Sequence, residues 1–176
     1  MPKAKKPIEE NDLLKAGITA IREIQEEMRI LLTHDRKAAL EIYKNKWKSQ
    51  ENITRGIDIT AENRCKAILH KKFSDRIVVL GEESLSDTTI DLSNEERVVA
   101  LLDMVDGTDL LSRDLSNWCS AILFFYPTKR QILCSLVGDA YGQIYYATNQ
   151  KQGAFKIFLF DKKIIQINSV PSVQDI

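Results

Sequence analysis

The chain has 176 residues, of which 44% are apolar, and its 25 basic and 25 acidic side chains cancel. This composition is typical of one globular domain with a sizeable core, and no apolar run approaches the roughly 20 residues of a membrane span. The first ten residues lack the apolar segment of a signal peptide, and the three cysteines lack C-x-x-C spacing, which predicts reduced thiols in a cytoplasmic protein without a zinc site.

The first part of the chain predicts helices. Residues 1–10 (MPKAKKPIEE) are expected to form a flexible basic tail. From Asn11 to Leu32, apolar residues recur at spacings of three and four, which predicts an amphipathic helix with Asn11 or Asp12 as its cap. A second helix is expected at about 35–48 and a third, shorter one at about 60–73.

The rest of the chain predicts strands. Short β-branched and aromatic runs follow one another at 76–80, 98–102, 120–126, 131–137, 143–147, 153–159 and 163–168. Residues 127–130 and 139–142 provide hairpin-type turns. Helices followed by closely spaced strands predict an α+β fold over residues 11–176, in which two long N-terminal helices pack on a mainly antiparallel sheet of about six strands.

Charge is segregated along the chain. Residues 76–120 hold ten acidic and three basic side chains, whereas the segments on either side are mildly basic. This distribution argues against a nucleic-acid surface. It indicates either a cation site or acidic surface loops, and charge alone favours the loops.

Two of the predicted strands end in acidic residues. The run 77–80 leads into Gly81-Glu-Glu-Ser84, and the run 98–102 leads into Asp103-Met-Val-Asp-Gly-Thr108. Carboxylates at the ends of neighbouring strands can converge, and Glu83, Asp103 and Asp106 would then need a cation such as Mg²⁺ between them. Gly107 permits a tight turn, and the start of a short helix at Thr108 favours an anion such as phosphate. Taken piece by piece, the same residues also fit two loops with a turn and a capping threonine.

Taken together, the ordered set G-E-E-S, a spacer of about twenty residues and D-M-V-D-G-T resembles the inositol monophosphatase family. This family belongs to the Li⁺-sensitive, Mg²⁺-dependent phosphatases, and its corresponding segment reads D-P-[IL]-D-G-T. The resemblance extends through the predicted strand at 120–125 to Tyr145-Tyr-Ala147 and Gly153-Ala-Phe155. It covers roughly residues 11–176 and implies a sugar-phosphatase-like N-terminal domain.

The resemblance also implies roles for single residues. Glu83, Asp103 and Asp106 would hold the metal ions together with the backbone carbonyl of Val105. Thr108 would polarise the attacking water with Glu83. The backbone amides of Gly107 and Thr108 would receive the phosphate, which makes Glu83, Thr108 and Asp103 the expected catalytic residues.

Some positions depart from the family pattern. Glu82 is expected to be a weaker ligand or a neighbour of the site. The family places an aspartate in a D-x-V-T-x-x-D segment that serves a further metal, and here the segment 58–63 leaves Glu62 or Asn63 in that role. Met104 replaces the family proline, and Asp109 puts a negative charge next to the expected phosphate site.

The family's second half, with its W-D-x-A-A-G segment, has no counterpart in these 176 residues. The resemblance predicts a Mg²⁺-dependent phosphomonoesterase that acts on a small sugar, inositol or nucleotide phosphate, and Mn²⁺ or Ca²⁺ could replace Mg²⁺ in binding. The alternatives are a metal- or phosphate-binding regulatory domain without turnover, or an oligomerisation module that uses the exposed sheet edge. A homo-oligomer with no membrane or nucleic-acid partner is expected.

Overall fold

The computed structural model describes residues 7–43, 54–87, 97–115, 117–151, 153–158 and 164–167. Its helical layer consists of α1 (Glu10–His34) and α3 (Gly56–Phe73), with the short α2 (Arg36–Ala39) between them. Two short strands, β1 (Ile42–Tyr43) and β2 (Thr54–Arg55), pair with each other beside the start of α3. Most of the expected basic tail, residues 1–6, lies outside the described residues.

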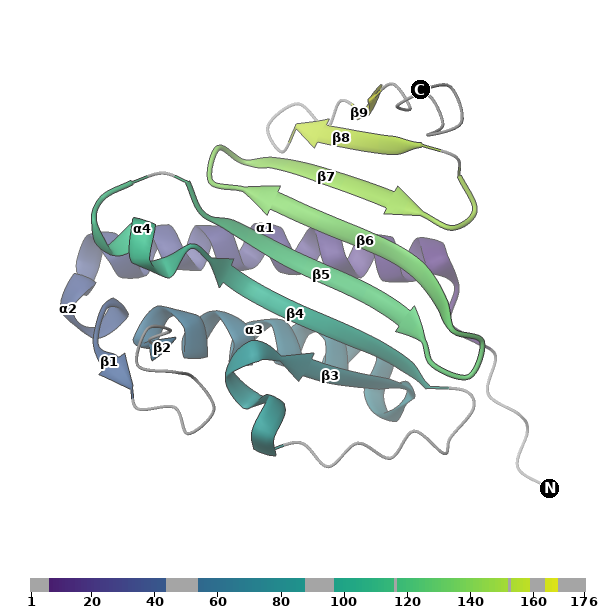
Figure 1. Cartoon of the computed structure of the whole chain (residues 1–176), viewed down its shortest axis with the longest axis horizontal. Coiled ribbons are helices and arrows are strands. Elements are labelled where there is room, and N and C mark those ends of the chain that lie inside the picture. The colour runs from purple at the N-terminus through teal and green to yellow at the C-terminus, as the bar shows by residue number, and fades with distance from the viewer. Residues whose placement is uncertain are drawn as a thin grey trace, which may run out of the picture.

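A single sheet of seven strands forms the second layer, in the order β3-β4-β5-β6-β7-β8-β9 (Figure 1). Its strands are β3 (Ile77–Gly81), β4 (Val98–Asp106), β5 (Cys119–Tyr126), β6 (Gln131–Asp139), β7 (Gln143–Thr148), β8 (Ala154–Phe158) and β9 (Ile164–Ile167). The β3–β4 pair is parallel and the other five pairs are antiparallel. The 3-10 segment η2 (Glu82–Asp87) follows β3, and the five-residue helix α4 (Thr108–Ser112) follows β4.

The expected α+β class is confirmed, but two details differ. The sheet has seven strands rather than about six. The second long helix is α3, because the helix expected at 35–48 ends after one turn: Asp35 caps α2 by accepting a hydrogen bond from the Ala38 backbone N–H, and the chain then enters β1. The expected third helix begins at Gly56 rather than 60, where the Asp58 carboxylate accepts a hydrogen bond from the backbone N–H of Arg55.

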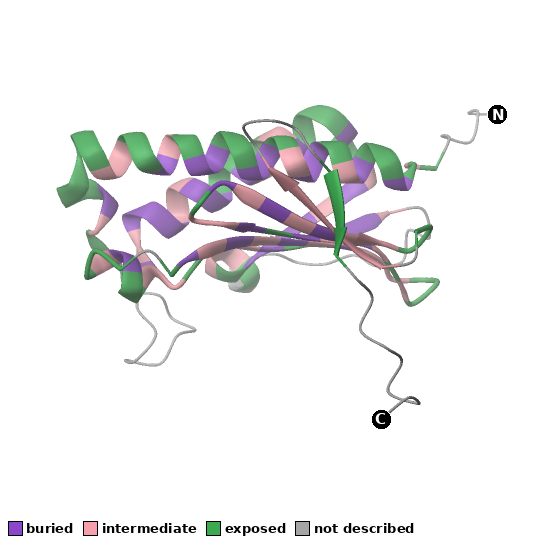
Figure 2. Cartoon of the chain, turned by 90° about the horizontal axis from the view of Figure 1, so that it is seen from above, coloured by how far each residue is buried: buried purple, intermediate pink, exposed green. Residues whose placement is uncertain are grey.

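The core lies between the helices and one face of the sheet (Figure 2). Helix α1 contributes a stripe that includes the fully buried Leu13, Ile21, Ile24 and Met28. Alternate residues of the central strands meet it, among them Ile122, Phe124, Leu136 and Ile144, because successive side chains of a strand point to opposite faces. Among the described residues, no helix is both long and apolar enough to cross a membrane.

Candidate metal and phosphate site

Four segments that are distant in the sequence meet at one end of the sheet. Because β3 and β4 are parallel and in register from Ile77–Val98 to Gly81–Leu102, both lead toward the same edge of the sheet. Their continuations, η2 and α4, therefore lie on the same side of the molecule as β2 and the first turns of α3 (Figure 1). This end of the sheet carries the acidic residues that the sequence singles out.

The end of β4 is irregular where the two aspartates lie. Asp103 is half-buried and still within the strand, and the pairing with β5 shifts register between Asp103 and Asp106. The intervening Met104 and Val105 are buried, whereas Asp106 is exposed. Gly107 then adopts φ +93°, a left-handed conformation that glycine tolerates best, and the chain turns into α4. Met104 thus occupies the family's proline position without displacing either aspartate from β4.

Thr108 is the residue in this segment with the most specific side-chain contacts. Its Oγ1 lies 2.6 Å from Asp58 Oδ1 and 2.8 Å from the backbone oxygen of Val105. Both neighbours are hydrogen-bond acceptors, so the single hydroxyl proton of Thr108 is directed toward them and away from the open side of the oxygen. The lone pairs of Thr108 Oγ1 can then accept a hydrogen bond from a water molecule. Asp58 itself is only 7% exposed, which makes it a buried carboxylate aimed at the site.

Glu83 is half-buried on η2 and is held at both its side chain and its backbone. Its Oε2 accepts a hydrogen bond from the hydroxyl of Thr54, a β2 residue that is 2% exposed. Its backbone N–H donates to Glu62 Oε2 at 2.8 Å. Thr54 of β2 therefore orients the Glu83 carboxylate, and Glu62 of α3 anchors the Glu83 backbone.

Glu62 packs beneath η2. It is buried, forms an ion pair with Lys66 at 2.7 Å, and lies so close to Gly81 that a Cβ at that position would come within 1.9 Å of its Cδ. Lys66 also donates to the hydroxyl of Ser84. These contacts make Glu62 a support for the β3–η2 junction, whereas Asn63 is exposed on α3.

The donor set suits a hard divalent cation, because Glu83, Asp103, Asp106 and the Val105 carbonyl all offer oxygen ligands. The side chains do not form a single coordination sphere, however. Within the described ranges, no three Asp, Glu, His or Cys side chains are grouped closely enough to hold a metal ion. Two of these carboxylates accept hydrogen bonds from protein donors instead. Glu83 accepts one from the Thr54 hydroxyl, and Asp106 accepts one from the thiol of Cys119, with an Sγ–Oδ2 distance of 3.8 Å. The oxygen donors and their place at one end of the sheet therefore suit a divalent metal ion, but the side chains of the described residues are not arranged around one point.

Cys119 is protonated in this environment. Burial, and secondly the carboxylate of Asp106, raise the pKa of the thiol to about 11. It can therefore donate weakly to Asp106 at neutral pH, and it does not compete with oxygen ligands for a hard cation.

The negative charge of Asp109 is balanced by an arginine. Arg55 Nη2 lies 3.2 Å from Asp109 Oδ1, and the Arg55 side chain is only 14% exposed. Arg55 also donates to the backbone oxygen of Leu40. Since α4 has only five residues, a phosphate at Gly107 and Thr108 would depend on single N–H groups and on nearby cations such as Arg55, and little on a helix dipole.

Sequence reasoning therefore identified the strand-end acids but missed three residues: Thr54, Arg55 and Asp58. The available signal was the spacing of Arg55 and Asp58, which is that of a helix cap and its third residue. The structure places Asp58 at Thr108, Glu62 at the β3–η2 junction, and Asn63 and Glu82 on the exposed surfaces of α3 and η2.

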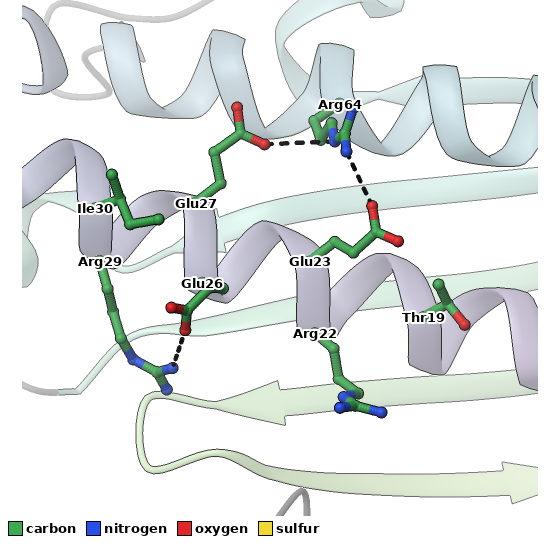
Figure 3. Close-up of a pocket in the computed structure, with 8 residues that line it drawn as sticks. All are labelled: Thr19, Arg22, Glu23, Glu26, Glu27, Arg29, Ile30 and Arg64. Carbon is green, nitrogen blue, oxygen red and sulfur yellow. Dashed lines mark hydrogen bonds and ion pairs between the residues drawn. The ribbon is translucent and has the colours of Figure 1, made fainter.

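A surface hollow between α1 and α3 shares no residue with this end of the sheet (Figure 3). Within it, Arg64 pairs with Glu23 at 3.0 Å and with Glu27 at 3.4 Å, and Arg29 pairs with Glu26. Because its three acidic side chains each pair with an arginine, the hollow does not present a field of one sign for a charged ligand.

Comparisons with known proteins give the class of fold. No family model matches the sequence, and no curated protein matches it. Solved structures do match: the inositol monophosphatase of Thermotoga maritima superposes with a TM-score of 0.65 at 20% identity, over 82% of this chain and 51% of that one. The extragenic suppressor protein SuhB of Bartonella henselae reaches a TM-score of 0.68 at 14% identity, over 86% of this chain and 53% of that one.

Staphylococcal inositol monophosphatase-1, solved as an inhibitory complex soaked in LiCl, superposes with a TM-score of 0.67 at 19% identity, over 86% of this chain and 52% of its own. Other matched structures contain inositol monophosphate, or NADP with Ca²⁺. The chain thus has the inositol monophosphatase fold, as its motifs predict, and spans about half the length of the structures that it matches.

Proposed function

We propose that this chain provides the water-activating and metal-holding residues of a Mg²⁺-dependent phosphomonoesterase. The observation that supports this most directly is the 2.6 Å contact between Thr108 Oγ1 and the buried Asp58, next to the strand-end acids. A buried carboxylate aimed at a hydroxyl that directly follows a strand ending in acidic residues is an arrangement that structural packing alone does not require.

The residues would divide the work of hydrolysis. Asp58 holds the proton of the Thr108 hydroxyl, so that the Thr108 oxygen accepts a hydrogen bond from the attacking water and orients it. Glu83, fixed by Thr54, accepts the second hydrogen of that water. A divalent cation held by Glu83, Asp103, Asp106 and the Val105 carbonyl would acidify the water and neutralise phosphate charge. Gly107 and Thr108 would hold the phosphate by their backbone amides, with Arg55 close by.

The substrate class is a small phosphorylated metabolite, namely a sugar, inositol or nucleotide phosphate. Solved structures of the same fold contain inositol monophosphate or NADP, which supports this class. Matched structures with Ca²⁺, and the inhibitory Li⁺ complex, support a divalent metal, with Mg²⁺ as the working ion and Mn²⁺ or Ca²⁺ able to bind. The three cysteines are free thiols, which supports a cytoplasmic location.

A second function is a metal- or phosphate-binding regulatory domain without turnover. One observation favours it: the carboxylates of the described residues are not gathered into a metal group. Losing one metal ligand or one charge-stabilising group commonly costs a hydrolase several kcal/mol of transition-state stabilisation.

Phosphate release from a panel of phosphomonoesters separates the two functions. For the phosphatase we expect release that requires Mg²⁺, is inhibited by Li⁺, and is lost in Asp103→Asn. Thr108→Val should reduce kcat by about a hundredfold because the water loses its acceptor, while Thr108→Ser retains most activity. Release that is unaffected by Asp103→Asn would contradict the proposal. Mg²⁺ binding by calorimetry without release from any substrate would favour the regulatory domain.

A further inference from the structure

The short helix α4 is held at both ends by arginines from the part of the chain between α1 and α3. At its far end, Arg36 Nη2 forms an ion pair with Asp114 Oδ1 at 2.8 Å, and both side chains are exposed. At its near end, Arg55 Nη2 forms an ion pair with Asp109 Oδ1 at 3.2 Å. The two pairs have the same chemistry, but only Asp109 directly follows Thr108. A role of Asp109 at the phosphate site should therefore not be shared by Asp114.

The guanidinium of Arg55 has more donors than partners. Its side chain is 14% exposed. Of its five N–H donors, the described residues engage two, through the backbone oxygen of Leu40 at 3.3 Å and through Asp109. Its Nε is buried without a hydrogen-bond partner. Because a buried donor without an acceptor is unfavourable, Arg55 is suited to bind an anion more fully than its protein partners do.

Asp109 holds this guanidinium weakly. A single contact joins its Oδ1 to Arg55 Nη2, whereas an arginine can bind a carboxylate or a phosphate by two parallel N–H···O bonds. The Asp109 side chain is 56% exposed, so water can hydrogen-bond the carboxylate once the arginine leaves it. An anion with more charge and a better fit to the guanidinium can therefore replace Asp109.

Arg55 is also linked to Thr108 through a buried carboxylate. The Arg55 backbone N–H donates to Asp58 Oδ2 at 2.7 Å, and the other Asp58 oxygen lies 2.6 Å from Thr108 Oγ1. Asp58 is only 7% exposed, so this link is protected from solvent. The Arg55–Asp109 pair is the exposed link between the same two segments. An anion at the backbone amide of Thr108 would meet the guanidinium by replacing that exposed link alone.

We propose that Arg55 binds the phosphate group of the substrate, and that this phosphate takes the place of Asp109. Before phosphate binds, Asp109 is an internal anion that occupies Arg55. The phosphate then forms the pair instead, because it carries more negative charge and offers two oxygens to the guanidinium. Asp109 thereby lowers the affinity for the substrate phosphate and for the phosphate product alike. This exchange rests on the phosphate site of the proposed function, to which it adds a binding residue and a built-in competitor.

Calorimetric titration of the 176-residue chain with inorganic phosphate, in buffer that contains Mg²⁺, tests the exchange. Asp109→Asn removes the competing charge and keeps the shape of the side chain, so phosphate should bind about tenfold more tightly than to wild type. Asp114→Asn is the matched control, because it removes the same charge from the arginine pair at the far end of α4. Its phosphate affinity should stay within about twofold of wild type. Equal affinities of the two variants, or no phosphate binding by wild type and Asp109→Asn, would overturn the proposal.

Arginine variants separate exchange from simple repulsion. Arg55→Met should weaken phosphate binding by about tenfold or more, and Arg55→Lys, which keeps the charge but loses the planar fork, by about threefold. In the Arg55→Met protein, Asp109→Asn should improve binding by no more than about threefold, since no arginine remains to be released. A full gain there would show that Asp109 acts by repulsion alone and would overturn the exchange. Circular dichroism checks folding, and the two aspartate variants, both at exposed positions, decide the matter if Arg55→Met does not fold.

Failure of the exchange and failure of the phosphatase give different results. Mg²⁺-dependent turnover that is lost in Asp103→Asn, together with a phosphate affinity that does not respond to Asp109→Asn, would remove the exchange and leave the phosphatase. A phosphate affinity that responds as expected, without turnover of any phosphomonoester, would support the exchange in a binding domain and contradict the phosphatase.

Discussion

The centre of the sheet, where α1 packs on β5, β6 and β7, is joined by apolar side chains, whereas the end of the sheet beside β2, η2 and the first turns of α3 also buries polar ones. At the centre, fully buried residues such as Ile24 and Phe124 fill the space, with Gln25 as a polar exception that donates to the backbone oxygen of Asp139. At the site end, Thr54, Asp58 and Glu62 are all buried and all hydrogen-bonded across elements.

This difference separates the part of the molecule that stabilises the fold from the part that positions reactive groups. Burying a polar group is costly unless its partners are in place, so a concentration of such groups at one sheet end is not expected from packing alone. The apolar centre gives the rigid support, and the polar end positions Glu83 and Thr108. The two regions should therefore respond differently to substitution.

The largest effect is expected at the centre. Ile24→Ala should lower the free energy of unfolding by about 3–4 kcal/mol, because it removes buried methylene groups and leaves a cavity under the sheet. Ile30→Ala is the matched control on the same helix, where the side chain is 52% exposed, and should change stability by less than about 0.5 kcal/mol. Urea denaturation measures both. Equal effects of the two variants would show that α1 does not hold the sheet as described.

An intermediate effect is expected at the site end. Lys66→Met leaves the buried Glu62 without its ion-pair partner and should cost about 2–3 kcal/mol, less than a fully buried pair because Lys66 is 24% exposed. Adding Glu62→Gln removes the uncompensated charge and should recover at least half of the loss. Urea denaturation of the three variants checks this. A double variant that is as unstable as Lys66→Met would mean that the Glu62 charge is not the cause.

The same contrast explains what the sequence could predict. The strands expected at 120–126, 131–137 and 143–147 are found as Cys119–Tyr126, Gln131–Asp139 and Gln143–Thr148, because their runs of β-branched and aromatic residues are continuous. The helix expected at 35–48 was wrong over residues 40–43, because local apolar spacing there is weak and the Asp35 cap with the turn at Leu40 decides the structure instead; residues 44–48 lie outside the described residues.

The site was only half predictable for a related reason. Glu83, Asp103 and Asp106 could be placed at one sheet end because each follows a recognisable strand. Asp58 and Thr54 could not, because their contacts join residues 50 and 29 positions apart in the chain. Such contacts depend on how α3 docks beside β3 and β4, which no local pattern reports.

The smallest expected effect lies in the pH dependence of stability, through one buried thiol on α3 (Cys65) and one on the central strand β6 (Cys134). Burial raises the pKa of the Cys65 and Cys134 thiols from 9.0 to about 12, with the carboxylates of Glu62 and Glu10 adding to the shift. The unfolded chain then loses these protons first as the pH rises, so the stability that the neutral thiols contribute is full well below pH 9, begins to fall as the pH approaches 9, and is lost progressively up to pH 12. From pH 7 to pH 9, ionisation of the two thiols together should lower the free energy of unfolding by about 0.8 kcal/mol.

Urea denaturation at each pH measures this loss. The double variant Cys65→Ala/Cys134→Ala should show a correspondingly flatter profile, since all other titrating groups are shared. Cys119 is left unchanged in both proteins because it lies at the site end, in contact with Asp106. Parallel profiles for wild type and variant would show that the buried thiols do not contribute to the alkaline loss of stability.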